Sequence, residues 1–178
     1  MAVVRQKISK KGFTLIELLV TVVVLSIVIF IGVDLFVNIL KNNNKATITN
    51  EVRQNGQLVM AILERNIRES IEVSPIGQTK KLTLTKSNGA NVEIECVDPT
   101  ATENGKITLN GVSITNENKD SGVNVVGSCM MEAISTPPTP IIIVGRFEFE
   151  QSKFSPTRKD FVANISFNPT FSLRSKTE

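Results

Sequence analysis

Glu17 is the residue whose position most needs a chemical explanation. It is the sole charge in the apolar run of residues 13–33, and insertion scales put a charge at the bilayer centre at roughly 2.5–3.5 kcal/mol. Gly12 lies just before this run and follows Lys10-Lys11. A peptidase that cuts between Gly12 and Phe13 at the cytoplasmic face would remove a basic leader and keep the apolar segment. The chemistry to consider is therefore peptide cleavage next to a retained carboxylate.

Other reactive chemistry is poorly represented. The chain contains no His, so the commonest general acid-base and the commonest zinc ligand are missing. It has no G-x-S-x-G, P-loop or G-x-G-x-x-G motif, the patterns of hydrolase and nucleotide sites. We expect no catalytic residue, no metal and no cofactor, and a secreted enzyme is the weakest alternative.

The positive charge is concentrated at the start of the chain. The net charge is +3, from 20 basic and 17 acidic residues, and residues 1–12 hold four of the basic residues and no acid. The alkaline pI therefore belongs to this leader, and overall charge gives no argument for nucleic-acid binding.

The apolar run has the length of a membrane span. A helix over residues 13–33 is roughly 30 Å long, which matches the hydrocarbon core of a bilayer. Its β-branched residues favour a strand in water, but a lone strand cannot satisfy its backbone in lipid. The positive-inside rule then leaves residues 1–12 in the cytoplasm and the bulk of the chain outside it. We expect residues 13–40 to form the transmembrane part of a helix.

An amphipathic pattern continues over residues 41–74. Apolar residues recur at helical spacing, and Pro75 and Gly77 end the pattern. If Asn42, Asn43 and Asn44 bend the chain without breaking it, one helix runs from Phe13 to about Val73. The apolar stripe comprises Ile48, Val52, Val59, Leu63, Ile67 and Ile71.

The remaining residues, 75–178, read as a β-rich head. Alternation with period two around Ser87-Asn88-Gly89 and around Asn110-Gly111 predicts two hairpins. Irregular loops are expected at residues 98–105 and 116–122, and Pro137, Pro138 and Pro140 suggest a stiff linker. Further strands are predicted at residues 141–149, 161–167 and 171–173.

Cys96 and Cys129 lie 33 positions apart in the head. In a reducing compartment they would be small buried hydrophobes, whereas in an oxidising one they could form a single disulfide. Because the expected orientation places both outside the cytoplasm, we predict a Cys96–Cys129 disulfide.

The sequence KGFTLIELLV, residues 11–20, resembles the N-terminal motif of type IV pilins and type II secretion pseudopilins, which carry class III signal peptides. A Sec-type leader would be cut after the apolar run, behind an A-x-A-like triplet, and none follows. By this resemblance, Gly12 matches the residue before the scissile bond, Phe13 matches the residue that becomes N-terminal and N-methylated, and Glu17 matches the glutamate five residues in.

The resemblance implies an α+β fold of the pilin lollipop type, with a long N-terminal helix packed on an antiparallel sheet. It implies processing by a prepilin peptidase and methyltransferase. It also implies export through the cytoplasmic membrane by an assembly platform, and then incorporation among other pilin subunits in a cell-surface or periplasmic filament. Major pilins often carry a glycine near Ser26 and a proline near Asp34, which this chain lacks, so local melting of its helix is not expected.

Electrostatic pairing in low-dielectric surroundings would give Glu17 a role in such an assembly. Cleavage exposes a cationic amine at Phe13 in low-dielectric surroundings, and an amine and a carboxylate that are each costly alone become tolerable as a pair. We expect Glu17 to reach the Phe13 amine of a neighbouring subunit. LERNIRES at residues 63–70 and FSLRS at residues 171–175 loosely resemble minor pilins of the W type and pseudopilins of the J type.

Several alternatives stay open at this point. The chain could be an uncleaved bitopic membrane protein with a ligand-binding head, or a DNA-uptake subunit. A DNA-binding head needs a clustered basic patch, and the candidates are Lys80-Lys81 with Lys86, and Lys153 with Arg158-Lys159. Residues 116–124 have Asp/Asn spacing loosely like a calcium loop. A glycosylation sequon at Asn164 lies within a predicted strand.

Overall fold

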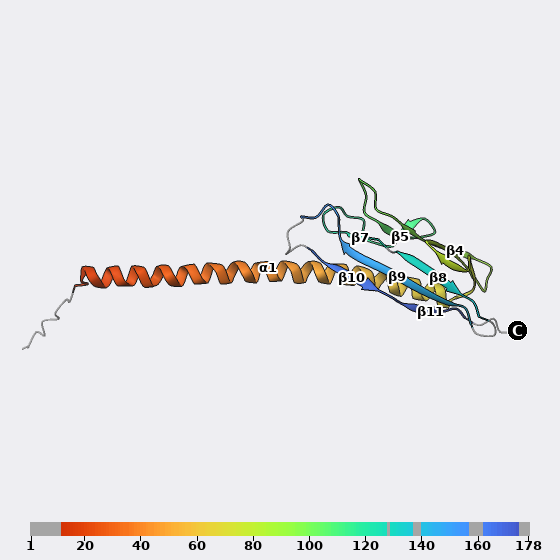
Figure 1. Cartoon of the computed structure of the whole chain (residues 1–178), viewed down its shortest axis with the longest axis horizontal. Helices are drawn as coiled ribbons and strands as arrows, with labels where there is room; N and C mark the ends of the chain where they lie inside the picture. Colours follow the sequence, from red (N-terminus) through yellow and green to blue (C-terminus); the bar gives the residue numbers. More distant parts are fainter. Residues whose placement is uncertain (1–11, 128, 137–139, 157–161, 175–178) are drawn as a thin grey trace, which may run out of the picture. The chain divides into compact units, whose positions relative to one another are not determined.

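The computed structural model describes residues 12–127, 129–136, 140–156 and 162–174. Its elements are one helix followed by eleven short strands among these residues (Figure 1). Contacts divide the chain into an N-terminal unit, Met1–Lys41, and a C-terminal unit, Asn42–Glu178. Residues 1–11 of the expected basic leader lie outside the described residues. The fold class is α+β, as predicted.

Helix α1 runs unbroken over Leu15–Arg68 and passes through the three asparagines. Its part in the N-terminal unit is exposed at every position. This part is long and apolar enough to cross a membrane. A helix that buries nothing inside its own chain must find its apolar partner elsewhere, either lipid or another protein.

The five-stranded sheet of the C-terminal unit has the strand order β1-β3-β4-β5-β6 and is antiparallel. Both predicted hairpins are present. In the first, Leu82 pairs with Ile94, and in the second, Leu109 pairs with Val112. The strands are β1 (Ser70–Ser74), β3 (Lys81–Lys86), β4 (Asn91–Val97), β5 (Lys106–Leu109) and β6 (Val112–Ser113).

The second sheet is built around β9 (Ile142–Gln151), the longest strand among the described residues. On one edge β9 pairs first with β8 and then with β7, and on the other it pairs with β11 and then β10. Strand β2 extends the sheet beyond β8. The additional strands are β2 (Gly77–Thr79), β7 (Val123–Val125), β8 (Met130–Ile134), β10 (Asn164–Phe167) and β11 (Thr170–Ser172).

The helix ends earlier than the pattern predicted. Arg68 is its last residue, and the segment expected to continue it to Val73 is strand β1. The β-branched residues of SIEVS favour a strand, and Val73 is buried opposite Leu84 of β3. Sheet pairing therefore overrides the helical spacing of Ile71, which lies in β1.

Strands β2, β7 and β8 were not predicted, because they are short and lack a clear signal of period two. All three residues of β7 are buried, and its Val-Asn-Val alternation is too short to indicate a strand, which takes four or more residues. The expected linker residues Pro137 and Pro138, and Phe161 at the start of the strand predicted over residues 161–167, lie outside the described residues.

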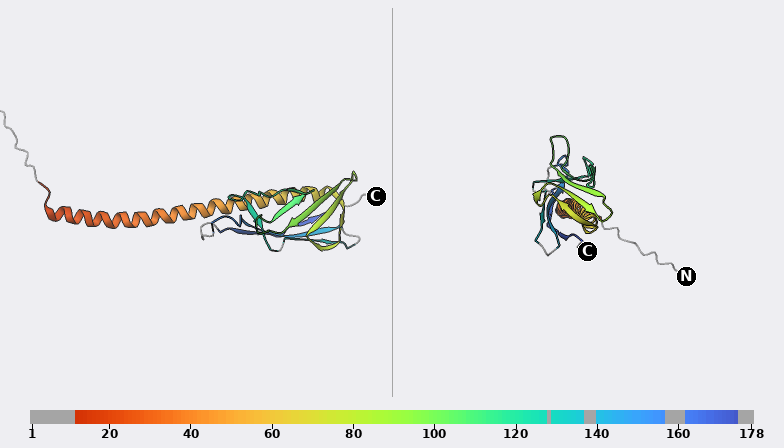
Figure 2. Two further views of the ribbon diagram at one scale, coloured as in Figure 1. Left: turned by 90° about the horizontal axis from the view of Figure 1, so that it is seen from above. Right: turned by 90° about the vertical axis from the view of Figure 1, so that its right-hand side faces the viewer.

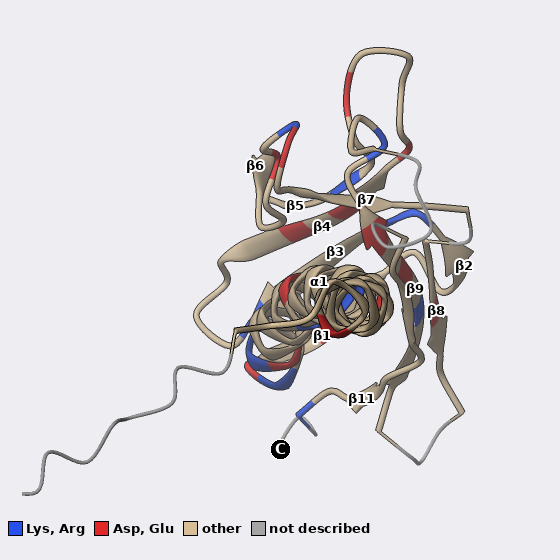
Figure 3. Cartoon of the chain, turned by 90° about the vertical axis from the view of Figure 1, so that its left-hand side faces the viewer, with Lys and Arg blue, Asp and Glu red and all other residues tan. Residues whose placement is uncertain are grey.

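The apolar stripe of α1 in the C-terminal unit is buried as predicted. Val52, Val59, Leu63 and Ile67 are each at most 1% exposed and join side chains from both sheets in one core. Viewed along the helix, the sheet with β3, β4 and β5 and the sheet with β8 and β9 line different sides of α1 (Figures 2 and 3). Phe147, Phe149 and Phe171 of the second sheet belong to this core.

Candidate functional site

The start of α1 holds the residues that the sequence singled out. Phe13 is 78% exposed, and the helix begins at Leu15. Thr14 is the N-cap residue, because its carbonyl accepts the first helical hydrogen bond from the Leu18 amide. Gly12 and Phe13 therefore lie just ahead of the helix, without regular secondary structure.

Glu17 and Thr14 cap each other. The Glu17 amide donates to Thr14 Oγ1 at 3.3 Å, and the Thr14 amide and hydroxyl each donate to Glu17 Oε2 at 3.4 Å. This is a capping box, in which two backbone donors of the first turn gain side-chain acceptors. A carboxylate in the first turn also interacts favourably with the helix dipole. Glu17 thus has a structural task inside its own chain.

Sequence reasoning missed this second role of Glu17. The signal was present, since Thr14-x-x-Glu17 directly before an apolar run is the capping-box pattern. The local contacts involve neutral partners, so they leave the negative charge of Glu17 uncompensated within the described residues. A carboxylate offers about four acceptor positions, and the capping contacts use Oε2. Among the described residues, Oε1 makes no hydrogen bond in this capping arrangement.

The other polar side chains of the apolar segment are satisfied by their own helix. Thr21 donates to the Leu18 carbonyl at 2.8 Å, and Ser26 donates to the Val22 carbonyl at 2.7 Å. Hydroxyls bonded in this way can face lipid or a packed helix without a further partner. Asp34 is the second acid of the segment, and it accepts from Asn38 Nδ2 at 3.4 Å.

The predicted disulfide is present in the structure. Cys96 and Cys129 are joined, and both are nearly fully buried. Cys96 lies in β4 of the five-stranded sheet, and Cys129 directly precedes β8 of the second sheet. The bond therefore links the two sheets of the C-terminal unit.

The first basic cluster is neutralised by carboxylates. Lys80 pairs with Asp98, Lys81 with Glu93 and Glu95, and Lys86 with Glu69. The Glu93 carboxylate raises the pKa of Lys81. Solvated ion pairs of this kind do not form the unpaired basic patch that DNA binding requires.

The second basic cluster is only partly described. Lys153 donates to the Thr100 carbonyl, and its Nζ lies 5.5 Å from the centroid of the Phe154 ring. Lys119 approaches the same ring at 5.3 Å. Arg158 and Lys159 lie outside the described residues.

The asparagine loop uses its side chains to hold its own backbone. Asn116 Oδ1 accepts from the Asn118 amide, and Asn118 Oδ1 accepts from the amides of Asp120 and Ser121. A calcium site in this loop would need the same side-chain oxygens as ligands, but here they accept hydrogen bonds from the backbone. Over the described residues no group of three or more His, Cys, Asp or Glu side chains is placed to hold a metal.

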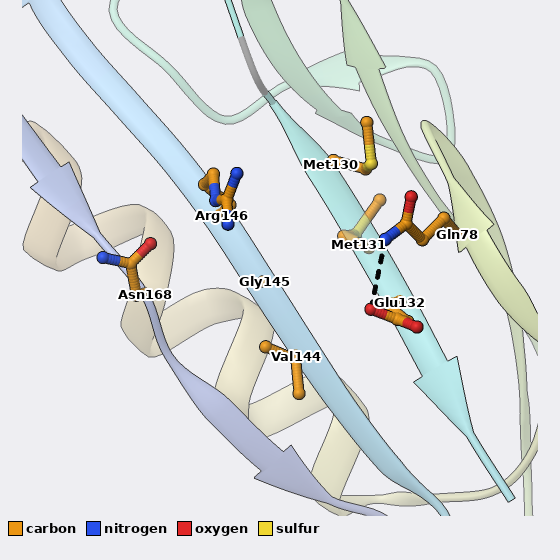
Figure 4. A pocket seen from close by; sticks show the side chains of 8 residues that line it. All are labelled: Gln78, Met130, Met131, Glu132, Val144, Gly145, Arg146 and Asn168. Carbon is orange, nitrogen blue, oxygen red and sulfur yellow. Dashed lines mark hydrogen bonds between the residues drawn. The ribbon is translucent and has the colours of Figure 1, made fainter.

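A groove on the outer face of the second sheet is the candidate ligand site if the head binds a ligand. It has a volume of about 340 Å³ and is lined by residues of β2, β8 and β9, including Gln78, Glu132 and Arg146 (Figure 4). Gln78 Nε2 donates to Glu132 Oε2 at 3.4 Å. Arg146 and Gln78 are exposed. Ligand sites normally bury a few convergent polar groups, and this groove holds its polar groups at the surface.

A family model described as the prokaryotic N-terminal methylation motif matches residues 7–33. The matched segment contains Gly12, Phe13 and Glu17, and it covers the leader end and much of the apolar part of α1. It leaves the whole C-terminal unit unmatched. Comparisons with curated proteins and with solved structures find no match to the chain.

Proposed function

We propose that this chain, which carries the class III signal and methylation motif of type IV pilins and pseudopilins, is a structural subunit of a type IV filament. The observation that carries the proposal is the matched motif at the start of a capped, exposed and apolar helix. A helix of this kind suits both membrane anchoring and later burial among identical or related helices.

In this proposal the bond between Gly12 and Phe13 is cut and the new amine of Phe13 is methylated. The bond lies ahead of the Thr14 cap, in chain without helical structure, so no helix has to unwind before a peptidase can bind this segment. The capping box means that the helix keeps a defined start after residues 1–12 are lost.

Glu17 then pairs with the Phe13 amine of a neighbouring subunit. The capping contacts hold Glu17 Oε2 at the helix start, which leaves Oε1 for the amine. Inside a bundle of apolar helices, an unpaired amine and an unpaired carboxylate are both strongly unfavourable, so docking relieves two penalties at once.

The finer assignment is a minor pilin or a pseudopilin. It rests on the resemblance of residues 63–70 and 171–175, which belong to the end of α1 and to the segment around β11. The head then lies outside the cytoplasm, anchored by a single span before assembly. The Cys96–Cys129 disulfide supports this placement, because such bonds persist in oxidising compartments.

Intact-mass analysis of the membrane-extracted protein tests the proposal. We expect loss of residues 1–12 and the gain of one methyl group. Gly12→Val should block processing, because the bulky side chain lies next to the scissile bond, whereas Gly32→Val, inside α1, should be processed normally. Gly32 is a matched control because a Cβ there meets nothing within 4 Å.

A mature protein that still begins at Met1 would exclude a filament subunit. It would favour the alternative, an uncleaved bitopic membrane protein whose head binds a ligand, for which the groove around Arg146 is the candidate site.

A further inference from the structure

Asp34 directly follows the apolar run of residues 13–33 and is the second acidic residue in the exposed part of α1. The capping and docking of Glu17 do not explain its presence. It is exposed and is followed by Leu35, Phe36 and Val37, which are exposed as well. Among the described residues it accepts a hydrogen bond from Asn38 Nδ2 at 3.4 Å, which is as long as the capping contacts of Glu17 and longer than the 2.7–3.2 Å of ordinary N–H···O bonds. The carboxylate therefore has only a weak, neutral partner within its own helix.

The spacing of Asp34 and Asn38 repeats the spacing of Phe13 and Glu17. Each pair is four residues apart, and the second pair lies 21 positions after the first. At 1.5 Å per residue the two pairs are separated by about 32 Å along the helix, with a relative rotation of about 60°. In helices that wind around each other at about 3.5 residues per turn, 21 residues are three heptads and the rotation vanishes.

We propose that Asp34 forms a second register contact with a neighbouring copy of this chain, in which it accepts hydrogen bonds from Asn38 and Lys41 of that copy. This inference rests on the proposed function, since it takes the contact between Phe13 and Glu17 as its starting point. It applies to a subunit present in several adjacent copies, and a minor subunit incorporated singly among other pilins would not form the contact. An axial offset of four residues brings the Phe13 amine of one copy level with Glu17 of the next. The same offset brings Asp34 of the first copy level with Asn38 of the second.

The neighbouring copy offers donors at this level. Asn38 and Lys41 are three residues apart, so they lie on one face of α1. Helical side chains lean toward the N-terminus, which directs the Lys41 ammonium back toward the level of Asn38. An amide and an ammonium are both hydrogen-bond donors to a carboxylate, and the charged donor gives the stronger bond.

The position of Asp34 explains why it is tolerated before assembly. Residues 13–33 span roughly the 30 Å of the hydrocarbon core, so Asp34 lies at its boundary, where water and headgroups solvate a carboxylate. In a filament the flanking apolar residues pack on neighbouring helices, and the charge then needs a protein partner. The contact becomes necessary only when assembly removes water.

Cysteine cross-linking in isolated filaments tests the geometry. Two differently tagged copies are co-expressed in the native host, one carrying Asp34→Cys and the other Asn38→Cys, and disulfide-linked dimers are measured on non-reducing gels. Controls change only the offset, with Asp34→Cys in both copies for no offset and Asp34→Cys with Asn42→Cys for eight residues. We expect the dimer of positions 34 and 38 to exceed both controls several-fold.

A double-variant series tests the energetics. Asn38→Leu leaves the Asp34 charge with a poorer partner and should lower the filament-bound fraction on the order of tenfold, because a desolvated charge is left underpaired. Asp34→Leu should lower it less, and the double variant Asp34→Leu/Asn38→Leu should recover much of the loss made by Asn38→Leu. Ser26→Leu is the control, because Ser26 is already satisfied by its own helix.

The outcomes separate this inference from the proposed function. Processed protein present in filaments, but with cross-links at another offset or only to a different subunit, would overturn the register contact and leave the filament proposal standing. A double variant no better than Asn38→Leu would also overturn it. A chain that keeps residues 1–12 and never enters filaments would overturn both.

Discussion

The two parts of α1 use the same backbone in opposite ways. Over residues 15–41 every side chain is exposed, whereas in the C-terminal unit Val52, Val59, Leu63 and Ile67 are buried against two sheets. Helical stability in proteins comes mostly from packing of an apolar face. The second part finds that packing inside its own chain, and the first can find it only in a membrane or in other subunits. The two acidic residues of the first part, Glu17 and Asp34, are therefore the ones to examine for partners outside the chain, because the hydroxyls of Thr21 and Ser26 are satisfied by their own helix.

The glycines of the helix show the same contrast. A Cβ built on Gly32 meets nothing within 4 Å, but one built on Gly56 lies 2.4 Å from Phe167 Cε2. Phe167 in turn stacks edge to face on Phe149, with the ring centroids 5.7 Å apart. Gly56 is thus the point at which an aromatic ring of β10 approaches the helix backbone, and Gly32 has no such task within its chain.

The largest effect that tests this contrast is expected at Glu17. Glu17→Ala removes both the capping box and the charge, whereas Glu17→Gln keeps the capping pattern, since Gln serves at this position. If the charge pairs with a Phe13 amine, both variants should be processed but fail to assemble, with a loss of about 3–5 kcal/mol when one partner of a buried pair is removed. Filament content of sheared surface or periplasmic fractions measures it.

Normal assembly of Glu17→Gln together with poor assembly of Glu17→Ala would show that capping, and not charge, is the role of Glu17. Thr14→Val is the matched variant for that case, because it removes the capping hydroxyl and keeps the carboxylate.

The disulfide tests the other region. Removing it through Cys96→Ala/Cys129→Ala should lower the free energy of unfolding of the C-terminal unit by about 3–4 kcal/mol, the chain-entropy value for a loop of this length. The loop closes across 33 positions. Thermal or urea unfolding of the extracted protein measures the change, and alkylation with and without reductant verifies the bond.

Processing after Gly12 should be unchanged in the same variant, because the cleavage site and the disulfide belong to different units. A stability equal to that of the unaltered protein would mean that the two sheets are held by their shared core alone.

How well each feature was predicted from the sequence depends largely on whether nearby residues or tertiary contacts decide it. The motif around Gly12, the span and the buried stripe of α1 were predictable because each depends on residues close together in the sequence. The end of α1 was wrong because pairing of Val73 with Leu84, a tertiary contact, decides it. Strand β7 was missed because its three residues, Val-Asn-Val, are too few to show a period of two. The capping role of Glu17 could have been predicted from the pattern Thr14-x-x-Glu17, but the prediction rested only on the charge of this residue.

One substitution made twice in α1 gives the next test. Gly32→Ala should stabilise the helix by about 1 kcal/mol, since Gly is less favourable than Ala in a helix interior. Gly56→Ala should instead destabilise the C-terminal unit by about 1–3 kcal/mol, because the new methyl group overlaps the Phe167 ring. Circular dichroism of the detergent-extracted, unassembled subunit measures both, by helical signal and by melting temperature.

Equal and favourable effects at the two glycines would mean that Phe167 moves aside at no cost. In that case the close approach of Phe167 to Gly56 would not contribute to the packing of β10 on the helix.

The smallest expected effect concerns two acids of the C-terminal unit whose pKa values move in opposite directions. Burial, and then the neighbouring Glu148 carboxylate, raise the pKa of Glu150. Bonds first from Lys86 and then from Arg65 lower the pKa of Glu69. Asn164 Nδ2 bridges Glu148 and Glu150, at 2.6 Å and 3.1 Å, and a glutamine at position 150 could still accept from it.

Proton linkage gives the direction in which each shifted pKa changes the stability with pH. The folded state binds a proton on Glu150 more tightly than the unfolded state, so stability falls as pH rises from the ordinary carboxyl value, about 4.3, through the raised pKa. Glu150→Gln should therefore make the protein relatively more stable at pH 7 and flatten this decline. Glu69 stabilises the fold at pH values above its ordinary pKa, and this stabilisation is lost as the pH falls through the lowered pKa.

Glu69→Gln should therefore remove a loss of stability that occurs at acid pH. Because Glu69 is exposed, the change in stability should be smaller than that of Glu150→Gln. Melting temperatures recorded across about pH 3 to 7 separate the two variants by the side of the profile that flattens. If Glu150→Gln instead lowers stability at neutral pH, the Glu150 carboxylate is held by favourable contacts that outweigh its burial and the repulsion from Glu148.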